Sequence, residues 1–159
     1  MSQITVKFKD GAEISYPAGV SCLELCREQA GGCKNIVAAR IDGRERDLGT
    51  VLLSDSEIDF LDFSAEAGAA IYRHSTGHIL AQAVKRLYPG ARLGIGPAIE
   101  NGFYYDFEFE EPISSDDLEK IEREMKKIIA EKLPFKRREL GREEALAFFE
   151  QRGEPYKCE

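Results

Sequence analysis

The sequence predicts an α+β protein of two units, and three observations support this class. Short segments of alternating apolar and polar residues, typical of strands, are separated by Asp-Gly and Asn-Gly turns. A short capped helix interrupts them, and two longer segments with helical periodicity follow at 71–88 and 115–132. With 43% hydrophobic residues, a chain of 159 residues can bury a real core.

The first sixty residues predict a small unit of strands with one helix across them. Turns are expected at Asp10-Gly11 and Asp42-Gly43 because both pairs favour two-residue hairpins. Ser21 and Glu24 form a capping-box pattern, and Gly31-Gly32 is a left-handed stop. The expected elements are strands at 3–9, 12–16, 36–41 and 58–62 and a helix at 22–30. This order predicts a β-grasp, ubiquitin-like unit over residues 1–62.

Residues 71–88 predict a helix that carries the two histidines of the chain, His74 and His78, four positions apart. At about 100° per residue, the apolar residues of this helix gather on one stripe. The stripe comprises Tyr72, Thr76, Ile79, Leu80, Ala83 and Leu87, and Ala81 and Lys85 share the opposite side with the histidines. A link of small residues at 63–68 is expected before the helix, with a domain boundary near 62–65.

An imidazole pair one helical turn apart has several chemical uses. Two imidazoles can share a metal ion, or one can orient a substrate while the other moves a proton. The alternative is a solvent-facing pair without a chemical role. The spacing alone leaves these interpretations open.

The second unit, expected over 66–159, continues with strands that share a turn at Asn101-Gly102. The segment RLGIGP predicts a strand in which Gly94 and Gly96 let another backbone or a ligand approach closely. In the next strand, aromatic residues alternate with polar, mostly acidic ones. The aromatic row is Phe103, Tyr105, Phe107 and Phe109. A base-stacking platform is one interpretation, and a strand that faces the core is the simpler one.

The last third of the chain predicts two helices and two extended segments. A helix over 115–132 buries the stripe Leu118, Ile121, Met125, Ile128 and Ile129, and a short helix over 143–152 buries Leu146 and Phe149. A strand is expected at 135–140, with the bases of 136–138 exposed. The end of the chain, through Pro155 to Cys158, is expected to be extended, as in a domain cut before its end.

Charge and cysteine content limit the classes of function. The net charge of −7 and pI of about 5.0 argue against tight unassisted binding to a phosphate backbone. Neither a signal segment nor a membrane span is found in the sequence, so a cytoplasmic protein is expected. The four cysteines are expected to be small buried thiols rather than ligands or disulfides. They are Cys22, Cys26, Cys33 and Cys158.

Three motifs together carry a family resemblance. A β-grasp unit, the segment RHSTGHILAQAVKRLYPGARLGIGPAIENGFYYDF and the segment RGEPYK closely resemble the N-terminal region of bacterial-type threonyl-tRNA synthetases, nearly end to end. The resemblance implies a TGS domain at 1–62. It also implies that 66–159 form the N-terminal part of an editing domain, which is shared in outline with alanyl-tRNA synthetases and alanyl-tRNA deacylases.

The resemblance implies a threonine–tRNA ligase whose second site hydrolyses mischarged seryl-tRNA. His74, His78 and Lys157 are then expected to be catalytic and Tyr105 to bind substrate. His74 would position the terminal ribose or the attacking water, and His78 would shape the pocket or act as a ligand. Lys157 would contact the ester-linked amino acid or the terminal nucleotide. The expected partner is the tRNA acceptor end. The parent enzyme would use ATP, Mg²⁺ and a catalytic-domain Zn²⁺, and would form a homodimer through domains absent here.

One departure from the family pattern limits these expectations. The second half-motif, CxxxH, is absent, because only Glu159 follows Cys158. With two imidazoles as a possible half-site, zinc binding by this region is expected to be weak. Alone, the region is expected neither to charge tRNA nor to edit. The alternatives are a non-catalytic binding or regulatory module that contains a TGS unit, and a free-standing metal-dependent deacylase.

Overall fold

The computed structural model describes residues 2–29, 31–134 and 138–158. The chain divides into two compact units, Met1–Tyr72 and Arg73–Glu159, which are taken separately below. Each combines helices with mostly antiparallel strands, so the predicted α+β class is confirmed. None of the described helices is long and apolar enough to cross a membrane.

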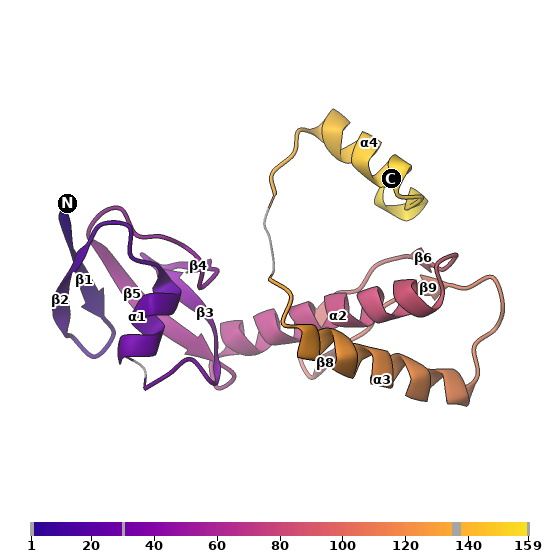
Figure 1. The fold of residues 1–159 in the computed structure, drawn as a ribbon, viewed down its shortest axis with the longest axis horizontal. Coiled ribbons are helices and arrows are strands. Elements are labelled where there is room, and N and C mark those ends of the chain that lie inside the picture. Colours follow the sequence, from indigo (N-terminus) through magenta and orange to yellow (C-terminus); the bar gives the residue numbers. More distant parts are fainter. Residues whose placement is uncertain (1, 30, 135–137, 159) are drawn as a thin grey trace. The chain divides into compact units, whose positions relative to one another are not determined.

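The first unit is built on a five-stranded mixed sheet (Figure 1). Its strands are β1 (Gln3–Phe8), β2 (Glu13–Pro17), β3 (Ile36–Ile41), β4 (Arg44–Arg46) and β5 (Ser56–Asp62). They lie in the order β2-β1-β5-β3-β4, with β1 and β5 parallel and the other neighbours antiparallel. Both predicted hairpins form, but the two-residue turn predicted at Asp10-Gly11 is wrong: the loop has three residues, Lys9 to Gly11, because Phe8 N donates to the Ala12 oxygen. In the second, Asp42 and Gly43 take positive φ angles of 48° and 79°, as a two-residue turn of this kind requires.

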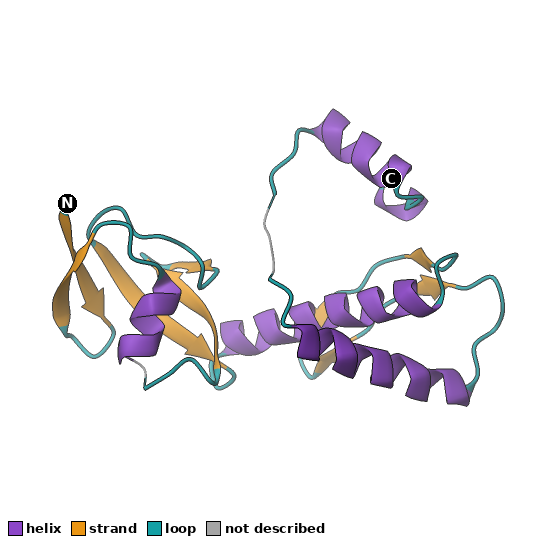
Figure 2. Cartoon of the chain, viewed as in Figure 1, coloured by secondary structure: helices purple, strands orange, loops and turns teal. Residues whose placement is uncertain are grey.

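Helix α1 (Cys22–Gln29) lies across this sheet, as Figure 2 shows. The predicted capping box is present, since Ser21 N donates to Glu24 Oε2 at 2.8 Å and Glu24 N donates to Ser21 Oγ at 3.3 Å. Leu25 and Cys22 are fully buried against the sheet, together with Ile4, Val6, Phe8, Tyr16, Ala39, Ile41, Leu52 and Ile58. Cys22 and Cys26 are buried free thiols, as expected, whereas Cys33 and Cys158 are free but only half-buried.

Helix α2 (Glu66–Leu87) begins five residues before the predicted start. Residues 66–68 are therefore helical, and the predicted link at 63–68 is wrong over that part. Asp62 stabilises the turn that precedes the helix, because its Oδ1 accepts hydrogen bonds from the Ser64 backbone N and Oγ. Gly68 permits the early start, since a Cβ there would lie 1.9 Å from the carbonyl oxygen of Asp62.

The predicted apolar stripe of α2 is only partly correct. Ala83 is fully buried, but Tyr72 and Leu87 are 52% and 37% exposed. Ala81, expected beside the histidines on the open side, is buried. The helix is covered on two sides within the second unit, by α3 and by short strands, and small residues at Gly77, Ala81 and Ala83 allow both contacts.

Four two-residue strands replace the two longer strands that the sequence predicted. They are β6 (Arg92–Leu93), β7 (Ala98–Ile99), β8 (Gly102–Phe103) and β9 (Phe107–Glu108), with β6 antiparallel to β9 and β7 to β8. The turn at Asn101-Gly102 was predicted one residue too late, because Ile99 pairs with Gly102 and the turn is Glu100-Asn101. The aromatic alternation is confirmed, and Phe107 and Phe109 pack against the core.

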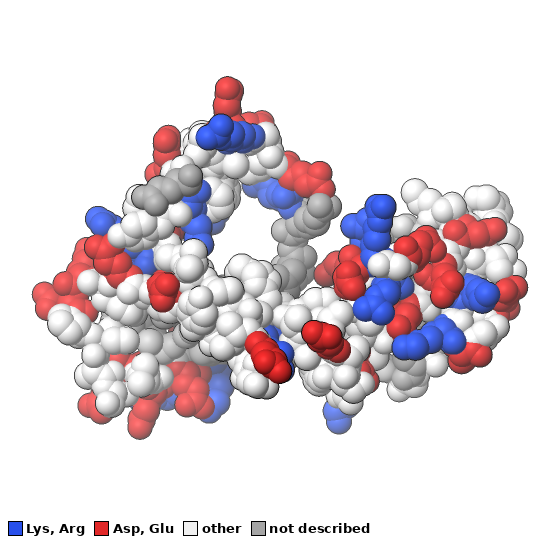
Figure 3. All heavy atoms as spheres, turned by 180° about the vertical axis from the view of Figure 1, so that it is seen from behind, with Lys and Arg blue, Asp and Glu red and all other residues white. Residues whose placement is uncertain are grey.

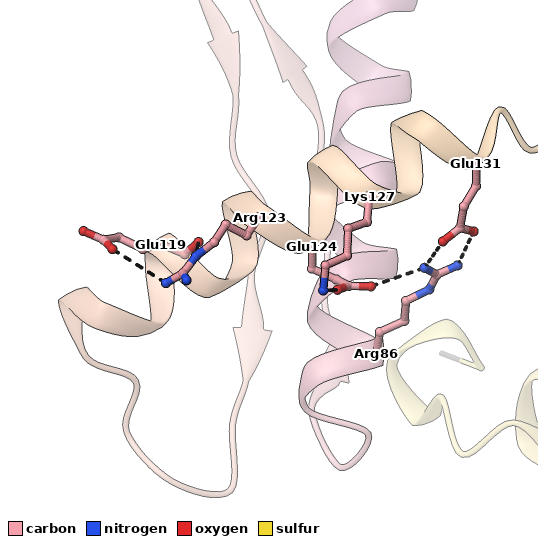
Figure 4. A network of polar contacts seen from close by, with 6 residues as sticks. All are labelled: Arg86, Glu119, Arg123, Glu124, Lys127 and Glu131. Atoms are coloured by element: carbon pink, nitrogen blue, oxygen red, sulfur yellow. Dashed lines mark hydrogen bonds and ion pairs between the residues drawn. The ribbon is translucent and has the colours of Figure 1, made fainter.

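Helix α3 (Ser115–Glu131) packs on α2, and ion pairs join the two helices (Figure 4). Arg86 of α2 binds Glu131 through two hydrogen bonds of 2.6 and 2.8 Å and Glu124 through one of 3.2 Å. Ile121 and Ile128 are buried as predicted, and Met125 is half-buried. Leu118 and Ile129, expected in the same stripe, are 59% and 56% exposed.

The C-terminal elements are α4 (Arg142–Gln151) and the 3₁₀ turn η1 (Pro155–Lys157). Leu146 and Phe149 are half-buried rather than buried. The extended end predicted for 155–158 is wrong, because Lys157 N and Cys158 N donate back to earlier carbonyls. Residues 135–137 of the predicted strand at 135–140 lie outside the described residues, and 138–140 are not a strand.

Replacing Gly68 with Ala is expected to destabilise the first unit by about 2 kcal/mol, because the new Cβ clashes with a backbone oxygen and the overpacking outweighs the helix propensity of Ala. Urea unfolding measures the change. Gly102→Ala is the matched control: a Cβ there meets no atom within 4 Å, so a change below about 0.5 kcal/mol is expected. An equal decrease in the free energy of unfolding in both variants would contradict the clash expected between a Cβ at position 68 and the Asp62 oxygen.

Arg86→Lys is expected to lower the thermal unfolding midpoint, because Lys cannot reproduce the two-pronged contact with Glu131. The difference should shrink as salt is added. Arg123→Lys serves as control, since among the described residues Arg123 contacts the exposed Glu119 of its own helix, with an ion pair of 3.7 Å and a 3.2 Å hydrogen bond to the Glu119 backbone oxygen. If the thermal unfolding midpoint falls equally in both variants, the α2–α3 contact does not depend on Arg86.

Candidate functional site

The two histidines form a directly contacting pair on the exposed side of α2. Nε2 of His74 and Nε2 of His78 lie 3.1 Å apart, and the rings are nearly perpendicular at 84°. At this distance one nitrogen donates a hydrogen bond and the other accepts it, so the pair shares one proton between two bases. Both side chains face away from the helix contacts, as the periodicity predicted.

Tyr105 lies between β8 and β9 and is fitted between two glycines. Its ring stacks on that of Phe107, with centroids 4.7 Å apart and planes at 20°. A Cβ on Gly96 would lie 2.2 Å from the ring, and a Cβ on Gly77 would lie 3.9 Å from it. The close approach predicted at Gly96 is therefore that of an aromatic side chain. Since Gly77 directly precedes His78, the ring lies beside the histidine helix.

Lys157 reaches the same region from η1. Its Nζ donates a 2.7 Å hydrogen bond to the carbonyl oxygen of Gly94 and lies 5.9 Å from the centroid of the Tyr105 ring. Gly94 itself approaches a backbone, because a Cβ there would be 3.1 Å from the Asp106 oxygen. The two glycines of RLGIGP therefore serve two neighbours: Gly96 makes room for Tyr105, while the carbonyl of Gly94 binds Lys157.

The charges around the pair keep one histidine neutral. Partial burial lowers the pKa of His78, and His74 and the Lys157 ammonium lower it further. An imidazole with a pKa below its ordinary value of about 6.5 is a free base at neutral pH. Burial raises the pKa of Tyr105, and the Glu154 carboxylate raises it further, so the phenol keeps its proton and can donate. The site thus holds a base, a phenol donor and a cation.

The histidine pair supplies two ligands for a metal ion. Zinc sites in proteins use three or four protein ligands, and within 2–29, 31–134 and 138–158 no group of three His, Cys, Asp or Glu side chains is suitable. The described residues by themselves therefore do not fit a zinc ion.

Two residues that bear on the site were missed by the sequence analysis. Glu154 is 7% exposed and pairs with Lys85 of α2 at 3.0 Å. The only sequence signal for this contact is position, since Lys85 follows His78 by seven residues, or two helical turns.

A cavity of 390 Å³ opens beside the carbonyl that binds Lys157, lined by Gly94, Ile95, Asp106, Phe107, Glu108 and Tyr156.

Comparison with known proteins identifies relatives along almost the entire chain, although no protein-family model matches it. The chain is 50% identical over 157 residues to a threonine–tRNA ligase of Acetivibrio thermocellus, covering 98% of this chain and 25% of that protein. It is 47% identical to the threonine–tRNA ligase of Desulforamulus reducens and 43% identical to that of Bacillus velezensis, again over 157 residues. The chain spans about a quarter of the length of these relatives. It is thus homologous over nearly its whole length to the threonine–tRNA ligases, a family of aminoacyl-tRNA synthetases, and corresponds to about one quarter of such an enzyme.

Proposed function

We propose that this region contributes to hydrolytic editing of seryl-tRNA within a threonine–tRNA ligase. The observation that carries the proposal is the cluster of His74, His78, Tyr105 and Lys157, which come from three separate elements of the second unit. In this proposal residues 1–62 form a TGS domain of β-grasp type, which the order of the five-stranded sheet and its parallel central pair support. Residues 66–159 are the N-terminal part of the editing domain.

The need for editing follows from the substrates. Serine lacks one methyl group of threonine, and a missing methyl gives a binding site only about 1–3 kcal/mol of discrimination. A synthetic site for threonine therefore also admits serine. A second site that hydrolyses the wrong ester supplies the remaining selectivity.

The four side chains suit the hydrolysis of an ester. The neutral imidazole of His78 takes a proton from water, so that the oxygen attacks the ester carbonyl carbon, and His74 orients that water or the terminal ribose. The carbon–oxygen bond to the ribose then breaks, and the leaving ribose oxygen takes the proton from the His78 imidazolium, which restores the neutral base. The Lys157 ammonium stabilises negative charge, either on the carbonyl oxygen or on the terminal nucleotide. Tyr105 donates a hydrogen bond from its phenol to the bound substrate.

The parent enzyme in this proposal charges tRNA with threonine in the cytoplasm, with ATP, Mg²⁺ and a catalytic-domain Zn²⁺, and acts as a homodimer. This region contacts only the acceptor end of the tRNA. Figure 3 supports a local contact, because Lys and Arg are interspersed with Asp and Glu on the visible face rather than forming one basic surface. The net charge of −7 also favours a local contact over an extended one with the phosphate backbone.

His74→Ala in the full-length protein is expected to leave threonine charging unchanged and to slow seryl-tRNA hydrolysis by roughly 10²-fold, because the attacking water or the terminal ribose is no longer oriented. Accumulation of seryl-tRNA in a charging reaction with serine measures the loss. Lys127→Ala, on the exposed side of α3, is the control. If both aminoacylation and hydrolysis fall equally, α2 is a folding element and a non-catalytic module is the better description.

Lys157→Ala is expected to move the acid limb of seryl-tRNA hydrolysis to higher pH. The Lys157 ammonium lowers the pKa of His78, so its removal raises that pKa toward its ordinary value. The base form of His78 is active, hence activity is lost at a higher pH as the solution is acidified. Single-turnover rates between pH 5 and 8 measure the shift, with Lys126→Ala as control. If the acid limb of the pH–rate profile stays at the same pH while the rate of hydrolysis falls, His78 is not the titrating base.

A further inference from the structure

The position of Lys157 depends on how η1 is attached to the rest of the second unit. Glu154 is the residue that precedes η1, and its backbone oxygen accepts a 3.0 Å hydrogen bond from Lys157 N. Its own backbone N donates to the Phe149 oxygen at 3.1 Å, at the end of α4. Any displacement of Glu154 therefore moves the turn that carries Lys157.

The Glu154 side chain is bound to the histidine helix by a single cation. Its Oε1 lies 3.0 Å from Lys85 Nζ, and its Oε2 is buried without a hydrogen-bond partner among the described residues. Lys85 Nζ also donates to the oxygens of Pro89 and Ala91 at 3.1 and 3.0 Å. The ammonium thus makes two hydrogen bonds and one ion pair, which fixes its position at the C-terminal end of α2.

The ion pair shares a helix face with the proposed site. Lys85 follows His78 by seven residues, so both lie on the same side of α2, about two turns apart. The carboxylate is almost fully removed from water, and a buried carboxylate is costly unless its partner is held in good geometry. Such a pair contributes little net stability compared with an apolar contact, but it defines one geometry.

We propose that the buried Glu154–Lys85 ion pair is a positioning device, which fixes η1 on α2 and so holds Lys157 beside the histidine pair. The inference rests on the proposed editing function for its consequence in catalysis. Glu154 and Lys85 are positioning residues, because they act through Lys157 rather than on the substrate. Loss of either charge releases the turn and breaks the hydrogen bond from Lys157 to Gly94.

The first measurement follows the position of Lys157 without reference to activity. In the full-length protein, Glu154→Gln and Lys85→Met are each compared with the unmodified sequence by acetylation with N-hydroxysuccinimide acetate, resolved by mass spectrometry. Acetylation of Lys157 relative to the exposed Lys34 is expected to rise about threefold or more in both variants, because local opening frees the ammonium. Glu122→Gln removes the carboxylate of an exposed pair and should leave the ratio unchanged.

The second measurement links that position to hydrolysis. Glu154→Gln is expected to reduce kcat for seryl-tRNA hydrolysis by roughly 10- to 100-fold, as for a misplaced catalytic group, with threonine charging unchanged. In the Lys157→Ala background the same substitution should cause no further loss, since its effect passes through Lys157.

The two measurements together decide whether the ion pair positions Lys157. An unchanged acetylation ratio overturns it whatever the activity, and so does a loss that adds fully to that of Lys157→Ala. A raised ratio with unchanged hydrolysis upholds the positioning role and shows instead that the proposed editing function is wrong. A raised ratio together with a non-additive loss supports both.

Discussion

The close approach of α2 to the strand segments beside it is the contact on which the second unit depends. Gly96 on the strand side leaves the room for the Tyr105 ring, because a Cβ there would overlap it at 2.2 Å, whereas a Cβ on Gly77 of the helix would lie in ordinary contact with the ring at 3.9 Å. The buried Ala81 and Ala83 keep the helix equally narrow along its length. Because the ring is confined in this way, the backbone around Gly94 comes within reach of Lys157. The absence of a side chain at Gly96 thereby determines where Tyr105 and Lys157 lie.

The electrostatics of the cluster follow from that geometry. Two histidines in contact cannot both be charged at low cost, and a nearby ammonium adds to the penalty, so a neutral base is favoured without a carboxylate to orient it. The acidic partner of the region, Glu154, is paired with Lys85 instead, and its charge adds to burial, the larger cause, in raising the pKa of Tyr105.

Local sequence signals predicted the first unit well and the second only in part. The hairpin at Asp10-Gly11, the capping box at Ser21 and the strand Ile36–Ile41 are local features, set by turn chemistry and propensity, and all are found. The errors arise where tertiary contacts decide: α2 extends to Glu66 because Gly68 can approach Asp62, and Ala81 is buried because a second surface covers the helix. His74, His78, Tyr105 and Lys157 could be named from motifs, but their distances could not. Glu154 and Lys85 carried no motif that identified them as a pair.

The charge of the region bears on how it could meet a nucleic acid. Each phosphate neutralised by Lys or Arg contributes to affinity through released counterions, and an acidic region with interspersed charges can neutralise few of them. Lys157 is already bound to a carbonyl rather than to a carboxylate, so an approaching anion meets a cation with undiminished charge. The histidines beside it add no competing negative charge. In the proposed editing function, this site binds the end of a strand that other parts of the parent enzyme hold in place, and it contributes less to binding than to chemistry. That division is compatible with a surface of mixed charge around a cationic site.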